Sequence, residues 1–120
     1  MEDFEKIYVD GVYVIVVNLC RSTLNETTTF RKLVEEEINS GHSNLVIDLS
    51  KCDFIDSTFF GAIILALKLT KGKGYELKVV EPANMGEDIF TTRNFCRIFD
   101  LYETREDAIK SFESDSHPNS

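Results

Sequence analysis

The sequence predicts a single α/β domain with a mixed, largely parallel sheet of about five strands, an N-terminal β-hairpin and about four helices. The first observation behind this prediction is the length of 120 residues, which suits one domain with one core. The second is the alternation of β-rich and helical patterns, which favours parallel strands joined by right-handed crossovers. The third is a composition of 42% hydrophobic and 28% charged residues, typical of a soluble globular protein.

The first part of the chain predicts a hairpin and then a helix. The β-rich runs FEKIYV and VYVIVVNL, within residues 4–19, flank Asp10-Gly11, a dipeptide suited to a tight turn with positive φ at both residues. From 24 to 38, apolar side chains recur at helical spacing, and Gly41 follows as a stop signal. The helix is expected to cover one side of the sheet.

The middle of the chain predicts the centre of the sheet. LVIDL, residues 45–49, is a nearly continuous apolar run, as expected of a strand buried on both faces. An apolar segment from 57 to about 70 is closed by Lys-Gly-Lys-Gly, residues 71–74, in the manner of a helix C-terminus. The run YELKVV, 75–80, is the next expected strand.

The last part of the chain predicts a helix over roughly 85–93 and a final strand, IFDLYE, at about 98–103. Thr104 then begins a last helix, because Thr104 and Asp107 stand at capping-box spacing. Residues 1–113 are therefore expected to form the domain, and the polar residues 114–120 a disordered tail.

Composition limits the classes of partner. A net charge of -8 disfavours nucleic acid and anionic lipid, since binding a phosphate backbone needs clustered Lys and Arg. No window approaches the ~20 apolar residues of a membrane span, and the first residues do not resemble a secretory signal. We therefore expect a cytoplasmic protein. Cys20, Cys52 and Cys96 fit neither a disulfide framework nor a clustered metal site, so reduced, mostly buried thiols are expected.

The loop DFIDSTFFG, residues 53–61, leads from the expected central strand into the most apolar helix, where sites of α/β proteins collect. Ser57 in this loop has two interpretations. As an N-cap, its hydroxyl accepts a hydrogen bond from a free backbone N–H of the first helical turn. As a phosphate acceptor, it would place an anion at the positive end of the helix dipole.

The outward side of the expected helix offers a docking surface. Helical geometry assigns Gly61 and Lys68 to the solvent side, opposite the buried positions. Ile64 and Leu65 flank this line and form an apolar strip that suits a protein partner. The alternative is that a neighbouring helix covers these two side chains.

At this loop the sequence resembles the STAS domain (sulphate transporter and anti-sigma factor antagonist). The family pattern is a buried strand, Asp-Ser, a Gly-containing helix start and an apolar helix, which here reads LVIDLSKCDFIDSTFFGAIILALK. The similarity continues through GYELKVVEP and TRNFCRIFDLYETREDAI, so it covers approximately residues 4–113. Within this family, the sequence resembles the bacterial anti-sigma factor antagonists.

The resemblance implies a phosphorylation switch. It implies that an anti-sigma factor with serine-kinase activity phosphorylates Ser57, and that the unphosphorylated chain sequesters this factor and so regulates sigma-factor-dependent transcription. ATP and magnesium would belong to the kinase, so no cofactor is expected in this chain. The implied partner-binding residues are Asp56, Ser57, Thr58, Phe60, Gly61, Ile64, Leu65 and Lys68.

The sequence also departs from the family pattern. Phe59 stands where the family usually has Gly, and a bulky aromatic beside the acceptor is expected to alter which kinase fits. Thr23 stands where the loop before the first helix usually has an acid, and Asn94-Phe95 replaces a common Gly-Leu. Thr58 is an alternative phosphate acceptor in the same helical turn.

Two other functions compete with this one. A serine-nucleophile enzyme is disfavoured, because there is no G-x-S-x-G elbow and the histidines, His42 and His117, are expected to be exposed and away from Ser57. His42 precedes the central strand and Ser57 follows it, so the two belong at opposite ends of the sheet. The second alternative is a STAS scaffold, or a soluble subunit of a stress-signalling or transport complex, without a phosphoswitch.

Overall fold

The computed structural model describes residues 3–18, 21–22, 24–52, 54–55, 57–82, 93 and 96–115. The strands of the main sheet are β1 (Phe4–Val9), β2 (Val12–Val17), β4 (Asn44–Asp48), β6 (Glu76–Val80) and β7 (Leu101–Tyr102). Two shorter strands, β3 (Arg21–Ser22) and β5 (Phe54–Ile55), form a separate pair. The helices are α1 (Leu24–Asn39), α2 (Ser57–Gly72) and α4 (Arg105–Asp115).

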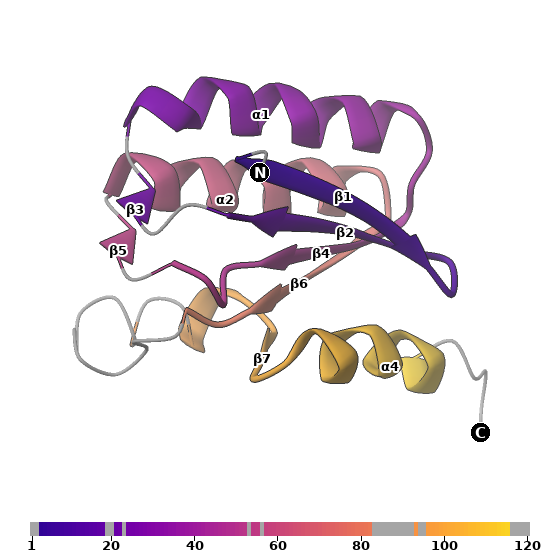
Figure 1. Ribbon diagram of the computed structural model, residues 1–120. Coiled ribbons are helices and arrows are strands. Elements are labelled where there is room, and N and C mark those ends of the chain that lie inside the picture. Colours follow the sequence, from indigo (N-terminus) through magenta and orange to yellow (C-terminus); the bar gives the residue numbers. More distant parts are fainter. Residues whose placement is uncertain are drawn as a thin grey trace.

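The five-stranded sheet has the order β1-β2-β4-β6-β7. β1 runs antiparallel to β2, and the other neighbouring pairs are parallel. Helices α1 and α2 cover one face of this sheet and α4 covers the other (Figure 1). The predicted mixed, largely parallel sheet with an N-terminal hairpin is therefore confirmed.

Glycines end the hairpin turn and two of the helices as predicted. Asp10 and Gly11 have φ values of 52° and 77°, so both turn residues adopt the left-handed conformation that the dipeptide indicated. Gly41 follows α1 with φ 90°, and Gly74 follows α2 with φ 75°. After α2, the backbone N–H of Tyr75 donates to the carbonyl oxygen of Thr70 at 2.8 Å, which closes the last turn in a Schellman motif.

The core lies on both sides of the sheet. Residues 45–49 are all buried, as predicted for a central strand. Between the sheet and α1 and α2, the rings of Phe30 and Phe59 pack with centroids 4.8 Å apart, and both side chains are fully buried. The opposite face is a smaller cluster made of Val12, Val14, Val16, Val46, Val80, Ala108 and Phe112.

The expected last strand at about 98–103 is confirmed as β7, but it is shorter than predicted. Only Leu101–Tyr102 pair as a strand, while 96–98 are helical. Phe99 is 6% exposed and its ring meets Phe60 of α2 edge-on at 6.0 Å, so packing against the helix, rather than strand pairing, accounts for this apolar residue. Of the expected helix at 85–93, only Arg93, which is helical, lies within the described residues.

The final helix begins as predicted and ends later. The side-chain oxygen of Thr104 accepts a hydrogen bond from the backbone N–H of Asp107 at 3.1 Å, which is the expected cap. α4 continues to Asp115, so it includes two residues that the sequence placed in the polar tail. Residues 116–120 lie outside the described residues.

Candidate functional site

The loop from β4 to α2 is anchored in the core before it reaches Ser57. Leu49 and Cys52 are fully buried. The backbone N–H of Leu49 donates to the carbonyl of Val80 at 3.0 Å, and that of Cys52 donates to the carbonyl of Leu49 at 2.9 Å. This anchoring places the start of α2 on a fixed support, as a precise binding site requires.

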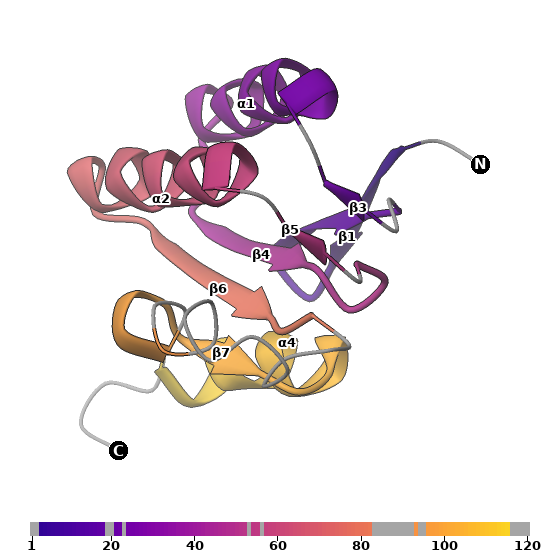
Figure 2. The ribbon, with the colours of Figure 1, turned by 90° about the vertical axis from the view of Figure 1, so that its left-hand side faces the viewer.

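A second support is the short parallel pair of β3 and β5. Arg21 pairs with Phe54 and Ser22 with Ile55 in backbone register. This pairing joins the connection before α1 to the connection before α2, and Figure 2 shows both helices starting at the same edge of the molecule. These strands are not predictable from the sequence, because two residues are too few to show a periodic pattern.

Ser57 is exposed and is the first residue of α2. Thr104, which does cap a helix, stands one position before α4, whereas Ser57 stands inside α2. No described residue hydrogen-bonds to the Ser57 hydroxyl, so the N-cap interpretation is not supported there. The hydroxyl is accessible, and the positive end of the helix dipole favours an anion at this position. Asp56 lies outside the described residues.

The outward side of α2 largely agrees with its prediction. Thr58, Gly61 and Lys68 are exposed. A Cβ placed on Gly61 would meet no atom within 4 Å, so packing within this chain does not require glycine there. Ile64 and Leu65 are partly buried, so neighbouring elements cover them in part and leave the rest open to solvent. These residues form a mixed polar and apolar surface that runs from Ser57 along the helix.

Phe59 and Phe60 have different roles from those expected. Phe59 is turned into the core against Phe30, so its ring does not lie on the surface beside Ser57. The expectation that this aromatic shapes the fit of a kinase is wrong. Phe60 is partly buried because it packs on Phe99, and it contributes only its remaining surface to the outward side of α2.

A buried carboxylate connects the beginning of the loop to α4. Asp48 is 2% exposed, and its Oδ1 accepts the backbone N–H of Ser50 at 2.9 Å. Its Oδ2 accepts a hydrogen bond from Nε of Arg105 at 2.9 Å. A cation in the first turn of a helix opposes the helix dipole, so this ion pair offsets an otherwise unfavourable position of Arg105. One carboxylate thus holds both the turn after β4 and the start of α4.

Arg105→Met is expected to lower the free energy of unfolding by about 1.5–3 kcal/mol, because it leaves the buried Asp48 carboxylate with fewer hydrogen bonds. Urea unfolding followed by circular dichroism measures this change. Lys110→Met removes the same charge from an exposed position of the same helix and should change the stability by less than ~0.5 kcal/mol. Equal effects of the two substitutions would contradict a structural role for the ion pair.

His42 lies at the other end of the fold from Ser57, between α1 and β4, as predicted. It is not freely exposed, which corrects the expectation. Its Nδ1 lies 2.9 Å from Oε2 of Glu37, and its ring lies 4.4 Å from that of Tyr13. Glu37 is 5% exposed, and its Oε1 also lies 3.5 Å from Nζ of Lys6. This cluster ties the hairpin to the end of α1.

The cluster predicts a loss of stability at alkaline pH. Burial raises the pKa of Tyr13, and the nearby Glu37 carboxylate raises it further. The pKa of Lys6 is raised most by its electrostatic interaction with Tyr13 and next by that with Glu37. Both groups hold their protons more tightly in the folded chain, so their stabilisation is complete below about pH 10 and is lost as the pH rises through the folded pKa values.

Urea unfolding between about pH 8 and 11 is expected to show this decline in the free energy of unfolding, because the proton-binding difference between the two states sets its slope. Tyr13→Phe should make the decline shallower, and Tyr8→Phe, on the exposed side of the same hairpin, should not. A decline that is identical in all three proteins would show that other groups cause it.

The cysteines differ in exposure. Cys52 is buried as predicted, Cys96 is exposed in contrast to the prediction, and Cys20 and Thr23 lie outside the described residues. Asn94, Phe95 and His117 lie outside them as well. Within the described ranges, no group of three His, Cys, Asp or Glu side chains could hold a metal ion. Among the described helices, none is long and apolar enough to cross a membrane.

Comparison with known proteins agrees with this architecture. A Thermotoga maritima relative, which carries the provisional name anti-sigma factor antagonist, is 28% identical over 103 residues, covering 85% of this chain and 90% of the relative. The crystal structure of a T. maritima protein with the same provisional name has a TM-score of 0.79 and 27% identity, and the match covers 92% of this chain and 94% of that chain.

More distant structures share the fold. The unphosphorylated anti-sigma factor antagonist SpoIIAA has a TM-score of 0.73 at 14% identity, with 92% of this chain and 97% of that chain covered. The murine anion transporter Slc26a9 has a TM-score of 0.67 at 15% identity, and the match covers 88% of this chain but 18% of the transporter. The family described as the STAS domain matches residues 10–108. This chain therefore belongs to the STAS domain family.

Proposed function

We propose that the chain is an anti-sigma factor antagonist, which binds an anti-sigma factor with serine-kinase activity and is released when Ser57 is phosphorylated. The observation that carries the proposal is the exposed Ser57 at the start of α2, on a loop anchored by buried residues. The STAS relatives named as antagonists support the class of partner. The resulting control of sigma-factor-dependent transcription would take place in the cytoplasm.

The physical basis of release is charge. A phosphate would add about -1.5 to -2 charge to Ser57, next in sequence to Asp56, and would have to be desolvated in a tight interface. The neighbouring partner surface would comprise Thr58, Gly61 and Lys68, with the open parts of the apolar side chains beside them. Thr58 is exposed too and remains the alternative acceptor.

We propose a binding function rather than an enzymatic one for this chain. The described histidine, His42, lies at the opposite end of the central strand from Ser57 and is engaged by Glu37 and Tyr13. It therefore cannot serve as a base for a Ser57 nucleophile without a large rearrangement. ATP, magnesium and the phosphoryl-transfer chemistry would be supplied by the partner.

A second candidate is a STAS scaffold or a soluble subunit of a stress-signalling or transport complex without a phosphoswitch. The observation that favours it is the shared fold with part of an anion transporter. In such a complex the same α2 surface would bind a partner, but a phosphate would not control the binding. The two candidates therefore differ in their response to ATP.

Size-exclusion chromatography of the chain with the anti-sigma factors of its own genome tests the proposal. We expect one complex to form without ATP and to dissociate after addition of magnesium and ATP. A non-hydrolysable ATP analogue is the control, because it fills the nucleotide site without transferring phosphate. A complex that persists with ATP would favour the scaffold, and the absence of any complex would exclude the antagonist function.

A further inference from the structure

Gly61 lies in the interior of α2, where glycine is unfavourable. The helix begins at Ser57 and ends at Gly72, so Gly61 is about one turn inside it. Glycine at such a position lowers the folding equilibrium constant about two- to fivefold relative to alanine, because it loses more backbone freedom on folding. The chain is therefore less stable than it would be with alanine at this residue, unless the structure requires glycine there.

Two usual requirements for glycine are absent at Gly61 within the described residues. One is a positive φ, which the structure shows at Gly11, Gly41 and Gly74 but not here. The other is close packing inside the chain, yet a Cβ built on Gly61 would meet no described atom within 4 Å. Alanine would therefore fit at this position without strain and without a clash.

The opposite side of α2 shows how this helix fills tight space. Ala62 and Ala66 are 6% and 1% exposed and belong to the core cluster between the helices and the sheet. Where neighbours within the chain limit the size of a side chain, the helix thus carries alanine. Glycine occurs instead on the exposed side, where the described chain imposes no limit. A limit imposed from outside the chain would produce this distribution.

Gly61 lies next to Ser57 on the surface of α2. The two residues are four positions apart, which puts them on the same side of the helix and about 6 Å apart along its axis. Both are exposed. Ile64 and Leu65, one turn further along, are partly open to solvent. A partner that contacts both Ser57 and these apolar side chains must pass directly over Gly61.

We propose that Gly61 sets how closely the protein partner approaches α2, because the missing side chain admits a backbone segment of the anti-sigma factor against the helix beside Ser57. This inference rests on the proposed function and adds the shape of the partner. Glycine permits such a close approach, since no Cβ stands between the two backbones. The partner segment at this point should present its own backbone or a small side chain, and its apolar groups would contact Ile64 and Leu65.

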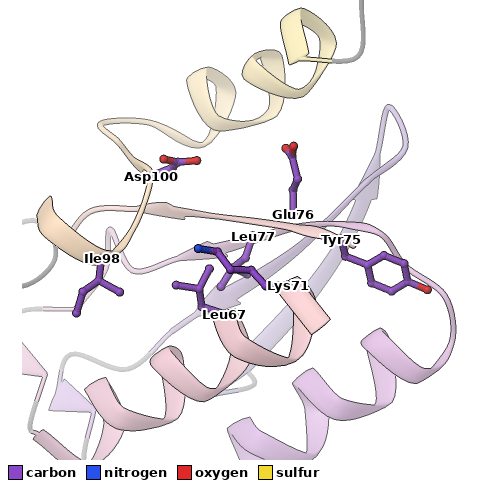
Figure 3. A pocket seen from close by; sticks show the side chains of 7 residues that line it. All are labelled: Leu67, Lys71, Tyr75, Glu76, Leu77, Ile98 and Asp100. Carbon is purple, nitrogen blue, oxygen red and sulfur yellow. The ribbon is translucent and has the colours of Figure 1, made fainter. Parts of the chain in front are cut away.

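The other end of α2 supplies a matched control. Gly72 is also exposed, and a Cβ built on it would meet no described atom within 4 Å. It lies 11 positions from Gly61, about 17 Å along the helix. At this end, Lys71 lines a cleft together with Glu76 and Asp100, away from the start of the helix (Figure 3). Substitutions at Gly72 therefore alter the same helix outside the proposed contact.

Urea unfolding of the chain alone tests whether the glycine is dispensable for the fold. Gly61→Ala should raise the midpoint of unfolding by about 0.3–0.7 M, because alanine favours the helix and meets no neighbour. Gly61→Met should give a similar rise, since methionine also favours the helix and would extend into solvent. A lower midpoint for Gly61→Ala would show that the chain itself needs glycine and would overturn the proposal.

Isothermal titration calorimetry without ATP, against the anti-sigma factor that forms the complex, tests the close approach. Gly61→Ala should raise the dissociation constant about fivefold and Gly61→Met about fiftyfold, because a larger side chain holds the partner further from α2. Gly72→Ala and Gly72→Met should change it less than about twofold. Equal losses for Gly61→Ala and Gly61→Met would indicate that helix stiffness affects binding, and would overturn the proposal.

The outcome is separable from that of the proposed switch. If both Gly61 variants bind as the natural chain does and ATP still releases the partner, the role of Gly61 is excluded and the switch stands. If the variants bind in the expected graded way but ATP releases none of the proteins, the close contact stands and the switch is excluded. A natural chain that binds no anti-sigma factor would exclude both.

Discussion

Ser57→Asp is expected to weaken binding of the anti-sigma partner at least about tenfold, a change of about 1.4 kcal/mol in binding free energy. The added carboxylate lies at the exposed start of α2, where it introduces negative charge into the proposed interface and must lose its hydration on docking. Isothermal titration calorimetry with the purified anti-sigma factor measures the change. The fold should be unaffected, because exposed substitutions alter stability by roughly 0.5 kcal/mol or less.

Ser57→Ala is the matched variant, since it removes the hydroxyl without adding charge. It should bind as the natural chain does and should remain bound when magnesium and ATP are added. Thr58→Ala separates the two candidate acceptors, because it should still be released by ATP if Ser57 takes the phosphate. Equal affinities of the Asp and Ala variants would contradict the charge-based switch.

Phe59→Ala is expected to lower the free energy of unfolding by about 3–5 kcal/mol, the usual cost of truncating a fully buried aromatic. Its side chain is 0% exposed and packs on Phe30, which joins α2 to α1. Urea unfolding measures the loss, and Phe59→Leu, which keeps most of the apolar volume, should lose much less. Phe60→Ala is the neighbouring control and should lose less than Phe59→Ala, because Phe60 is only partly buried.

The burial of Phe59 explains what this aromatic residue does at a position where the STAS family usually has Gly. The family usually has Gly at this position, and the sequence alone suggested a change beside the acceptor. The structure instead assigns the ring to the core, on the opposite side of α2 from the docking surface. A loss of stability below about 1 kcal/mol on truncation would contradict this assignment.

Regular elements of the fold were predictable because they carry periodic patterns and terminal signals. The hairpin followed from Asp10-Gly11, and the central strand followed from the apolar run 45–49. The pair of β3 and β5 was not predictable, since two-residue strands show no period. Around Phe99, packing against α2 takes the place of strand pairing, so the β-rich run 98–103 forms a strand only at Leu101–Tyr102.

The exposed residues of the candidate site were predictable from the sequence, but the buried charged residues that hold the surrounding elements in place were less so. The positions of Ser57, Gly61 and Lys68 followed from helix geometry and from the loop. The burial of Asp48 and Lys78 could not be predicted, because their partners are distant in the sequence. Arg105 binds the Asp48 carboxylate, and Nζ of Lys78 donates to the Ser111 hydroxyl at 2.8 Å. Such charges are buried only where distant elements supply partners.

The most direct test of the central claim is intact-mass and peptide mass spectrometry of the chain after incubation with the anti-sigma factor of its own genome and magnesium ATP. We predict a single added phosphate, located on Ser57, and none on the Ser57→Ala variant. A complex that forms while no phosphate is transferred, or a phosphate transferred only to another residue, would contradict the proposed switch at Ser57.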